Sequence, residues 1–572
     1  MLKYANIFSK TNIIPTFIRK LTLYLLSLFS KFIMKKQICL LAILFILMLL
    51  PFGSWAQSSA APARPAKNWQ NKSIEQDSVY GTGSDQALNL LKSRKSTQVV
   101  VAVIDGGVYI NHPAIKDNIW VNPKEIPNNK VDDDHNGYVD DVHGWDFIGG
   151  KDSDVRYDNV EVTRLYRLLD KKYHDVLPDN ISKADKAEYY QYLKVENVYT
   201  SRRRAFHQEY DYLINFVDTI GKMKKAMGKN DITKADLDSY NPSDSGMTRA
   251  KRRLLRNIKR FSVVIKDPSA DSIIKIIKPE LAQVNVALNY QYNTDFDPRF
   301  VVGDNYASDT ERYYGNNDVV GPTDVHATHV SGIIAGVRTG KPGSQEGIAD
   351  NVKIMVVRTV PDGDERDKDV ANSIRYAVAN GAKVINMSFG KGYSYDKKAV
   401  DAAMKFAEDH DVLMVHAAGN DGKNNDSSDH YPTRIYQNTH KEAQNWIEVG
   451  ASDTKGNPGI FSNYGKKTVD LFAPGVQVYS SVPDTGYAYF DGTSMAAPCV
   501  TGVATIIREY FPKLTAKEVK KILMKSVTKI TFKVPQPGQM DKKMVMYNSL
   551  CITGGVVNAT KAIQLALKQA GK

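Results

Sequence analysis

Three residues far apart in the chain, Asp105, His326 and Ser494, have the side-chain types needed for nucleophilic catalysis. A serine hydroxyl attacks a carbonyl carbon only when a neighbouring base removes its proton, and that base needs an acidic group to orient it. Each residue alone has an ordinary structural explanation, since Ser494 could cap a helix and a single histidine is commonly structural. Together, in the chain order Asp, His, Ser, they predict acyl-transfer chemistry.

The segments around these residues indicate how each side chain is held. Asp105 ends the apolar, β-branched run QVVVAVID, where backbone donors can keep a carboxylate ionised. His326 precedes a small and apolar helical pattern in DVHATHVSGIIAG, and Ser494 begins another in FDGTSMAAPCVTGVATIIREYF. We therefore expect the acid at the end of a strand, with the base and the nucleophile each at the start of a helix.

The elements that must position these residues follow a regular alternation. Continuous apolar runs, typical of strands buried on both faces, occur at 98–108, 352–360, 382–390, 411–420 and 445–452. Helical patterns lie between them at 369–381 and 397–410. This order predicts an α/β fold with a doubly wound, mostly parallel sheet. In such a sheet the ligand crevice lies beyond the C-terminal ends of the strands.

With these motifs assembled, the chain resembles the subtilisin-like serine peptidases, or subtilases, over residues 98–148 and 300–530. The block GTSMAAP at 492–498 is the most specific part of the match. The resemblance implies a sheet of the subtilisin type and a serine endopeptidase that hydrolyses polypeptide substrates through an acyl-enzyme. It makes Asp105 the orienting acid, His326 the base and Ser494 the nucleophile.

The resemblance also implies the rest of the site. Asn420 would donate its side-chain amide to the oxyanion, although Asn-Asp-Gly at 420–422 is also typical of a turn. Substrate would bind as an extended strand along Ser388, Phe389 and Gly390. A roomy first pocket would be walled by the small residues Ala417, Ala418 and Gly419, so we expect a large apolar residue before the cleaved bond.

Three positions depart from the family pattern. Gly106 stands where Ser or Thr usually follows the aspartate, Ala327 replaces the usual Gly after the histidine, and Ser331 replaces a usual Ala. None of these changes removes a catalytic group, so they bear on the turnover rate more than on the chemistry.

Two other functions are compatible with parts of the sequence. An inactive binding protein of the same fold would use its inserted segment as the working surface. A metallohydrolase could use His326 and His329, but no further cluster of metal-ligating residues stands near them in the sequence.

A second motif, NKVDDDHNGYVDD at 129–141, predicts a structural calcium ion. Positions 1, 3, 5, 7 and 9 of a calcium loop would be Asp132, Asp134, Asn136, the carbonyl of Tyr138 and Asp140, with Gly137 at the turn. Position 12 is His143 instead of glutamate, and Asp141 could supply the missing oxygen. The alternative is a solvated, Asp-rich turn without a metal.

Composition and charge fit an ordinary globular protein. The 572 residues are 42% hydrophobic and 24% charged, which excludes a disordered, collagenous or disulfide-scaffold chain. Seven basic residues and no acidic one lie in 1–56, so subtracting them from the formal charge of +13 leaves +6. Nucleic-acid binding is therefore not implied. The oligomeric state is not determined by the sequence.

Four parts are expected along the chain: an N-terminal extension with a signal peptide (1–56), a short arm (57–97), the peptidase domain (98–150 and 301–572) and a basic helical insertion (151–300). The insertion holds 28 Lys or Arg against 22 Asp or Glu, and only three glycines. The arm is too short to fold alone as an inhibitory prodomain.

The start of the chain predicts export. From Met34, two lysines precede an apolar stretch at 38–50, a proline and a Ser-Trp-Ala site before Gln57. This pattern is typical of a secretory signal peptide, which contacts the membrane only transiently; an uncleaved anchor is the alternative. The exported protein would be periplasmic or secreted, and in it Cys499 and Cys551 could form a disulfide or remain buried thiols.

Overall fold

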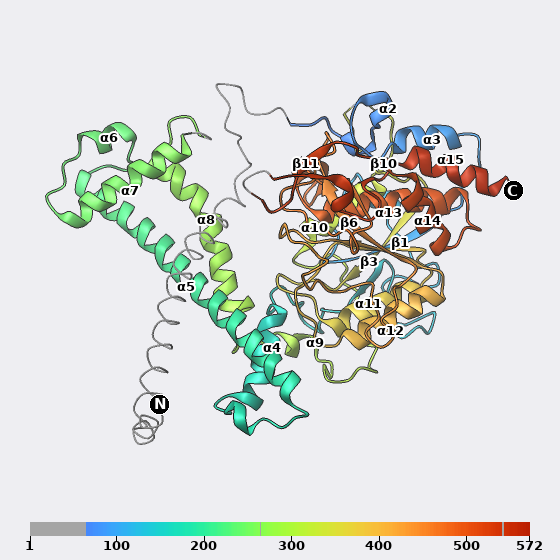
Figure 1. The fold of residues 1–572 in the computed structure, drawn as a ribbon, viewed down its shortest axis with the longest axis horizontal. Helices are drawn as coiled ribbons and strands as arrows, with labels where there is room; N and C mark the ends of the chain where they lie inside the picture. The colour runs from blue at the N-terminus through green and yellow to red at the C-terminus, as the bar shows by residue number, and fades with distance from the viewer. Residues whose placement is uncertain (1–63, 263–264, 342, 540–542, 572) are drawn as a thin grey trace, which may run out of the picture. The chain divides into compact units, whose positions relative to one another are not determined.

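The apolar runs of the sequence form a nine-stranded sheet in the computed structural model of the protein (Figure 1). The strand order is β10-β13-β7-β6-β5-β4-β1-β3-β2, and all neighbours are parallel except the β10–β13 pair. The strands are β1 (Val99–Asp105), β2 (Gly144–Asp146), β3 (Val352–Arg358), β4 (Val384–Met387), β5 (Leu413–Ala417), β6 (Trp446–Ser452), β7 (Leu471–Pro474), β10 (Thr528–Lys529) and β13 (Gly555–Val556).

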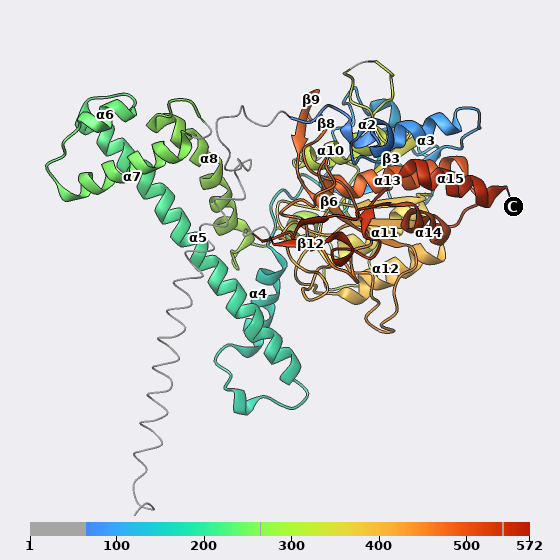
Figure 2. The same ribbon diagram turned by 45° about the horizontal axis from the view of Figure 1, so that its top comes forward.

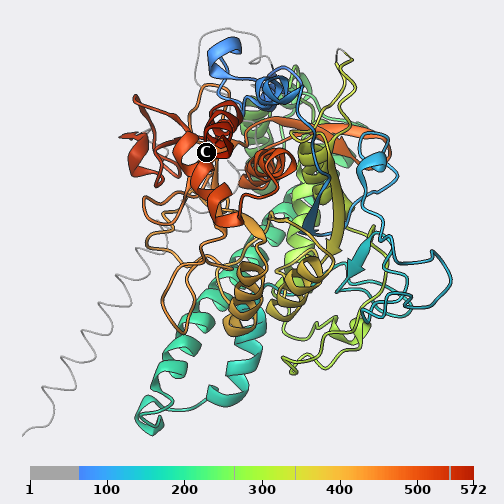
Figure 3. The same ribbon diagram turned by 90° about the vertical axis from the view of Figure 1, so that its right-hand side faces the viewer.

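Helices cover both faces of this sheet, as the alternation of its side chains requires. Successive residues of a strand point to opposite faces, so Val101 and Val103 pack in one apolar cluster while Ala102 and Ile104 pack in another. The first cluster includes α10 (Asp324–Ala335), α13 (Thr493–Tyr510), α14 (Ala516–Ser526) and α15 (Ala559–Ala570); the second includes α11 (Asp367–Ala379) and α12 (Lys397–Asp409) (Figure 3). The predicted α/β class with a doubly wound, mostly parallel sheet is confirmed.

The structure describes residues 64–262, 265–341, 343–539 and 543–571. The predicted signal peptide, and the arm before residue 64, lie outside the described residues. The described part of the arm packs on the domain through α2 (Ile74–Asp77) and α3 (Ser84–Leu91), and Trp69 is buried with its indole N–H 2.9 Å from the Gln477 carbonyl. Within the described ranges, no helix is both long and apolar enough to span a membrane.

Residues 151–300 are helical, as predicted for the insertion. They contain α4 (Glu161–Tyr173), α5 (Lys186–Met227), α6 (Lys234–Ser239), α7 (Ser245–Phe261), α8 (Ala270–Val286) and the start of α9 (Arg299–Val302). Helix α5 has 42 residues, a length of about 63 Å at 1.5 Å per residue. It packs along α4 near its start and along α8 farther on (Figure 2). Leu213, Phe216 and Ile220 of α5 form an apolar cluster with α7 and α8 that contains no residue of the sheet.

Two hairpins lie outside the main sheet: β8 (Val478–Val482) with β9 (Gly486–Phe490), and β11 (Lys533–Pro535) with β12 (Met544–Met546). Cys499 and Cys551 are both buried and both free, so the disulfide considered from the sequence is not formed.

Candidate active site

The C-terminal edge of the sheet brings the predicted acid and base together. Asp105 is the last residue of β1 and is 3% exposed, while His326 is in the first turn of α10. His326 Nδ1 lies 2.9 Å from Oδ1 and 3.0 Å from Oδ2 of Asp105. Burial lowers the pKa of His326, but the Asp105 carboxylate outweighs it, and the net shift is upward from 6.5. The imidazole side chain remains 40% exposed, so it can meet a substrate.

Ser494 lies in the first turn of α13 and faces the segment that follows β4. Its Oγ donates to the Ser388 carbonyl at 3.1 Å, and Ser388 Oγ donates to the Ser494 carbonyl at 3.0 Å. Among the described residues, no hydrogen bond joins Ser494 to His326. Hydrogen bonds between catalytic residues are commonly long or misaligned without substrate. In this structure Ser494 is held instead by Ser388, which belongs to the segment expected to bind the substrate.

Asn420 follows β5 and is held with its amide oxygen occupied. Asn420 Oδ1 accepts hydrogen bonds from the backbone N–H and the hydroxyl of Thr493, each at 2.9 Å. Thr493 Oγ1 in turn accepts from the Gly419 N–H at 3.1 Å. With the oxygen engaged, the Asn420 NH₂ group is the end left to point at a substrate. Sequence reasoning missed Thr493 as the residue that orients this amide; its place directly before Ser494 was the available signal.

The predicted substrate segments lie beside each other, with an unpredicted histidine between them. An added Cβ at Gly390 would be 2.4 Å from His430 Cε1, and one at Gly419 would be 3.1 Å from it. His430 Nε2 also lies 3.1 Å from the Ala417 carbonyl oxygen. Phe389 is half-buried, and Ala417 and Ala418 are buried. The imidazole therefore narrows the space that the small residues were expected to leave open.

Of the three departures from the family pattern, the one at Gly106 has a local explanation. A Cβ at Gly106 would lie 2.9 Å from the Thr323 carbonyl oxygen, so a larger residue is crowded there. The Gly106 N–H donates to Asp105 Oδ1 at 2.7 Å and supports the carboxylate without a side-chain hydroxyl. Ala327 is fully buried in α10. The Ser331 hydroxyl is buried with no hydrogen-bond partner.

The second histidine of the DVHATHVSG block is turned away from the triad. His329 is buried, its Nε2 lies 3.1 Å from the Ala488 carbonyl oxygen, and its ring stacks on Phe490. Burial lowers the pKa of His329 to about 3. In the described part of the chain, neither His326 nor His329 belongs to a group of residues that could hold a metal ion.

Only some of the predicted calcium ligands come together. The Asp132 carboxylate accepts from the N–H groups of Asn136 and Gly137 at 3.0 and 2.8 Å. The Asp140 carboxylate accepts from the N–H groups of Asn129 and Lys130 at 3.2 and 2.8 Å. These two carboxylates thus stabilise the backbone of the loop.

A different oxygen cluster forms from Glu125, Asp134 and Asp141, whose ligand atoms lie within 4.8 Å of one another. Asn136 donates to Asp141 Oδ2 at 3.1 Å, while the ring of Tyr138 is buried beside the cluster of Trp145 and Phe147. Burial raises the pKa of Asp141 to about 6 and that of Glu125 above its usual value. Glu125 Oε2 is buried without a partner. An all-oxygen set with an orphaned carboxylate oxygen fits calcium. Sequence reasoning missed Glu125 because it precedes the loop motif.

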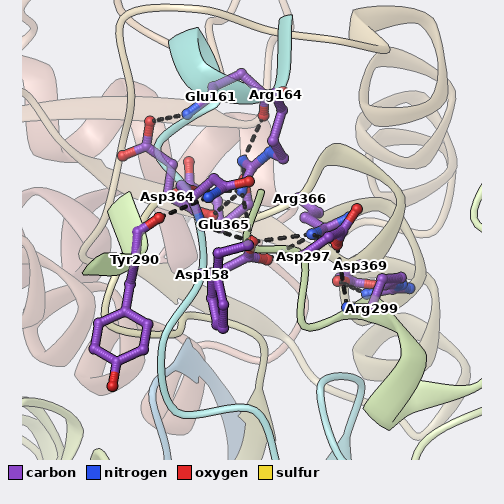
Figure 4. Close-up of polar contacts among 12 residues, drawn as sticks. Asp158, Glu161, Arg164, Tyr290, Asp297, Arg299, Asp364, Glu365, Arg366 and Asp369 are labelled. Carbon is purple, nitrogen blue, oxygen red and sulfur yellow. Dashed lines mark hydrogen bonds and ion pairs between the residues drawn. The ribbon is translucent and has the colours of Figure 1, made fainter. Parts of the chain in front are cut away.

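Buried charges attach the insertion to the residues next to the substrate segment (Figure 4). Glu161, the first residue of α4, receives hydrogen bonds from Arg164 at 2.7 Å and from Lys391 at 2.6 Å. Lys391 directly follows Gly390 and also lies 2.8 Å from Asp367. Burial alone would raise the pKa of Glu161, but the two cations bring it to about 2.

The other end of the insertion is fixed in the same way. Arg366 pairs with Asp158 at 2.6 Å and with Asp297 at 2.8 Å, so one guanidinium joins the segments on both sides of the insertion. Arg299 pairs with Asp369 of α11 at 2.6 Å and with Asp304. Figure 4 shows the carboxylates of Asp158, Asp297 and Asp369 beside the guanidinium groups of Arg366 and Arg299.

Comparison with known proteins finds the same family by sequence and among relatives. The model of the subtilase family matches residues 96–544. The cell wall-associated protease of Bacillus subtilis (strain 168) is 33% identical over 270 residues, which are 47% of this chain and 27% of that protein. Subtilisin DY of Bacillus licheniformis is 33% identical over 237 residues, which are 40% of this chain and 76% of that protein.

Coverage differs widely among these relatives, and the chain spans only about a quarter of the cell wall-associated protease. A solved structure of a protease from Pseudoalteromonas arctica PAMC 21717 is 27% identical, with a TM-score of 0.35; the match covers 44% of this chain and 78% of that one.

Proposed function

The chain belongs to the subtilase family, and from this premise we propose that it is an exported serine endopeptidase that hydrolyses peptide bonds through an acyl-enzyme. The hydrogen bonds that His326 Nδ1 donates to both carboxylate oxygens of Asp105 carry the proposal. They fix the tautomer in which Nδ1 bears the proton and Nε2 carries the lone pair that a general base needs.

In the first half of the reaction, His326 takes the proton of Ser494 as the serine oxygen attacks the peptide carbonyl. The imidazolium that forms is stabilised by Asp105, which stays ionised. The side-chain NH₂ of Asn420 and the backbone N–H of Ser494 then donate to the carbonyl oxygen as it becomes an oxyanion. The Ser494 N–H belongs to the first turn of α13, where N–H groups have no partner within the helix.

In the second half, His326 returns the proton to the leaving amine, and the acyl-enzyme remains on Ser494. Water attacks this ester with His326 again as the base, which releases the peptide acid and restores the serine. Thr493 supports both halves because it fixes the amide of Asn420 before charge develops.

Polypeptides in an extended conformation are the proposed substrates, bound along Ser388, Phe389 and Gly390. Export to the periplasm or outside the cell is supported by the signal-peptide pattern and by the name of one relative, the cell wall-associated protease. His430 bounds the pocket beside Gly390 and Gly419. A large side chain before the cleaved bond, as expected from the sequence, therefore requires this imidazole to move.

Labelling with a fluorophosphonate tests the proposal. The protein should become covalently labelled in the presence of a chelator, and Ser494→Ala should abolish both labelling and peptide hydrolysis. The matched control is Ser549→Ala, at an exposed serine away from the site. A protein that hydrolyses peptides without being labelled, or that binds peptides without cleaving them, would contradict it.

We also propose a structural calcium ion, held by Glu125, Asp134 and Asp141 with the loop at 129–141 folded around them. A calcium ion that binds only the folded state raises the melting temperature. Glu125→Gln and Asp134→Asn should each reduce this rise. If Glu125→Gln leaves the response unchanged and Asp132→Asn removes it, the ligands are those first predicted from the loop spacing.

A further inference from the structure

Two histidines and a glutamate lie together behind the substrate segments, outside the triad. His416 is in β5 and Glu448 is its register partner in β6, while His430 comes from the loop between these strands. One ligand atom from each lies within 4.8 Å of the other two. His416 Nδ1 is 3.1 Å from both Glu448 oxygens, and His430 Nε2 is 4.0 Å from Glu448 Oε1.

This cluster contains a buried carboxylate that needs a positive charge. The Glu448 side chain is 8% exposed and that of His416 is fully buried. Arg434, the nearby guanidinium, is engaged by both oxygens of Asp470 at 3.0 and 2.8 Å. Among the described residues, no lysine or arginine forms a salt bridge with Glu448. A buried charge is costly without a partner, so either an imidazolium or a bound cation must balance Glu448.

The donor set favours a transition metal over calcium. Two imidazole nitrogens and one carboxylate oxygen form the ligand set of open zinc sites, which keep a fourth position for water. Calcium and magnesium prefer oxygen ligands only. Ligand atoms about 2.0 to 2.2 Å from one zinc ion lie roughly 3.3 Å apart in a tetrahedron, so the 3.1 Å separation fits already and the 4.0 Å separation requires a small movement of His430.

Groups around the cluster hold its members in place. The Trp446 indole N–H donates to Glu448 Oε2 at 2.8 Å, and the Glu448 backbone N–H donates to Asp470 at 2.7 Å. Outer hydrogen bonds of this kind orient the ligands of metal sites. His416 Nε2 is buried without a partner, so the pairing with Glu448 leaves this ring with an unsatisfied nitrogen.

An entry path reaches the cluster from the surface. A groove of ≈ 730 Å³ is lined by both His430 and Glu448, and by residues of the same loop such as Asn425 and Thr433. The groove exposes two of the three ligand residues, and none of residues 388–390 or 417–419 lines it, so an ion could reach the cluster from this side.

From these observations we propose that His416, His430 and Glu448 form a binding site for a divalent transition metal of the zinc type. Because the His430 ring lies beside Gly390 and Gly419, the bound ion would fix the imidazole that bounds the substrate pocket. Coordination through Nε2 would replace the hydrogen bond that this nitrogen makes with the Ala417 carbonyl oxygen. The site is separate from the triad and from the calcium cluster.

Cobalt titration tests the site without relying on peptidase activity. The Ser494→Ala protein, saturated with calcium, should bind about one equivalent of Co²⁺ and give the visible absorption of a tetrahedral complex, and Zn²⁺ should displace it. His430→Ala should abolish the absorption. It removes a partly exposed ligand from a loop and leaves the sheet intact. Glu448→Gln is a second test if it folds.

The matched control is His174→Ala, which removes an exposed histidine beside Asp170 and Asp175. This variant should bind Co²⁺ as the parent does. The proposal is overturned if the parent shows no tetrahedral cobalt spectrum, or if His430→Ala keeps the same spectrum and affinity. Neither result bears on the triad, because the parent in this experiment already lacks the nucleophile.

Discussion

The peptidase core and the helical insertion are stabilised in different ways. In the core, the sheet is covered on both faces by apolar clusters that gather residues from distant segments. The insertion has separate, smaller apolar clusters: one between α5, α7 and α8, and two between α4 and α5. It joins the core through buried ion pairs centred on Glu161, Arg366 and Arg299.

This difference indicates what each region requires. An apolar side chain can pack against several alternative neighbours. A buried ion pair needs both of its members, because removing one leaves the other charge buried and strongly destabilises the fold, so such pairs favour one geometry. The junction lies beside Lys391, next to the substrate segment. We infer that the ion pairs fix the insertion at one position relative to the substrate segment, while apolar packing supplies most of the stability of the core.

The largest expected effect is the loss of turnover when a catalytic side chain of the core is removed. Ser494→Ala and His326→Ala should each lower the turnover number by about six orders of magnitude, and the double variant by little more, because the residues act as a unit. Single-turnover kinetics would measure this, with the urea midpoint showing that the fold is intact. Additive losses would contradict the shared mechanism.

Asp105→Asn should lower turnover by about 10⁴-fold, because the imidazole loses the partner that fixes its tautomer. Asp105 raises the pKa of His326 above 6.5, and activity needs the neutral ring, so activity rises with pH through this raised pKa. In the variant the acid limb of the kcat/KM profile should move to lower pH.

The upward shift of the His326 pKa also makes the stability of the fold depend on pH. Protonated His326 stabilises the folded state fully below about pH 6.5, and this contribution is lost as the pH rises through the folded pKa. Asp105→Asn should therefore flatten the pH dependence of the urea midpoint in this range. If Asp105→Asn leaves both the pH–rate profile and the pH dependence of the urea midpoint unchanged, Asp105 does not control the protonation of His326.

Removing one charge from the buried junction should lower the stability of the protein more than removing an exposed ion pair. Glu161→Gln leaves the buried cations Arg164 and Lys391 short of a carboxylate and should cost about 3 to 5 kcal/mol. The control is Lys405→Met, which removes an exposed ion pair with Asp409 and should cost little. Equal urea midpoints for the two variants would show that the junction is not the stabilising contact.

Shortening the insertion should change access more than chemistry. The rings of Phe206 and Tyr292 are 5.2 Å apart, so a short linker can replace residues 208–286. The junction beside Lys391 leads us to expect that part of residues 151–300 flanks the substrate cleft. The shortened protein should then cleave casein faster relative to a small peptide ester, by a few-fold. An unchanged ratio would show that residues 208–286 do not limit access to the cleft, and would leave a stabilising or partner-binding role for this part of the insertion.

The smallest expected effect concerns one buried hydroxyl in the core. Ser331→Ala removes a group that has no hydrogen-bond partner, so it should leave the melting temperature unchanged or raise it slightly. A clear loss of stability would show that the hydroxyl has a partner, such as a bound water.

Much of the core follows from local sequence, because its signals are local. The run that ends at Asp105 is apolar and β-branched, and a strand buried on both faces needs such residues. The predicted positions of His326 and Ser494 at helix starts are correct because small apolar residues follow each of them.

What the sequence could not supply depends on contacts between distant segments. Glu161, Arg164 and Lys391 look like ordinary surface charges until the fold brings them together. His430 occupies space that the small residues Ala417, Ala418 and Gly419 were expected to leave open. In the acidic loop, the spacing rule ranked Asp132 as a ligand, but local backbone N–H groups take its oxygens.

The buried state of Cys499 and Cys551 makes the protein suitable for site-selective labelling. Burial raises the pKa of both thiols, so at neutral pH they are protonated and shielded from maleimides. With Cys39 replaced, one cysteine introduced on α7 and one on α12 would carry a donor and acceptor dye pair. Energy transfer between them would then report whether the insertion keeps its position relative to the sheet when a peptide inhibitor binds.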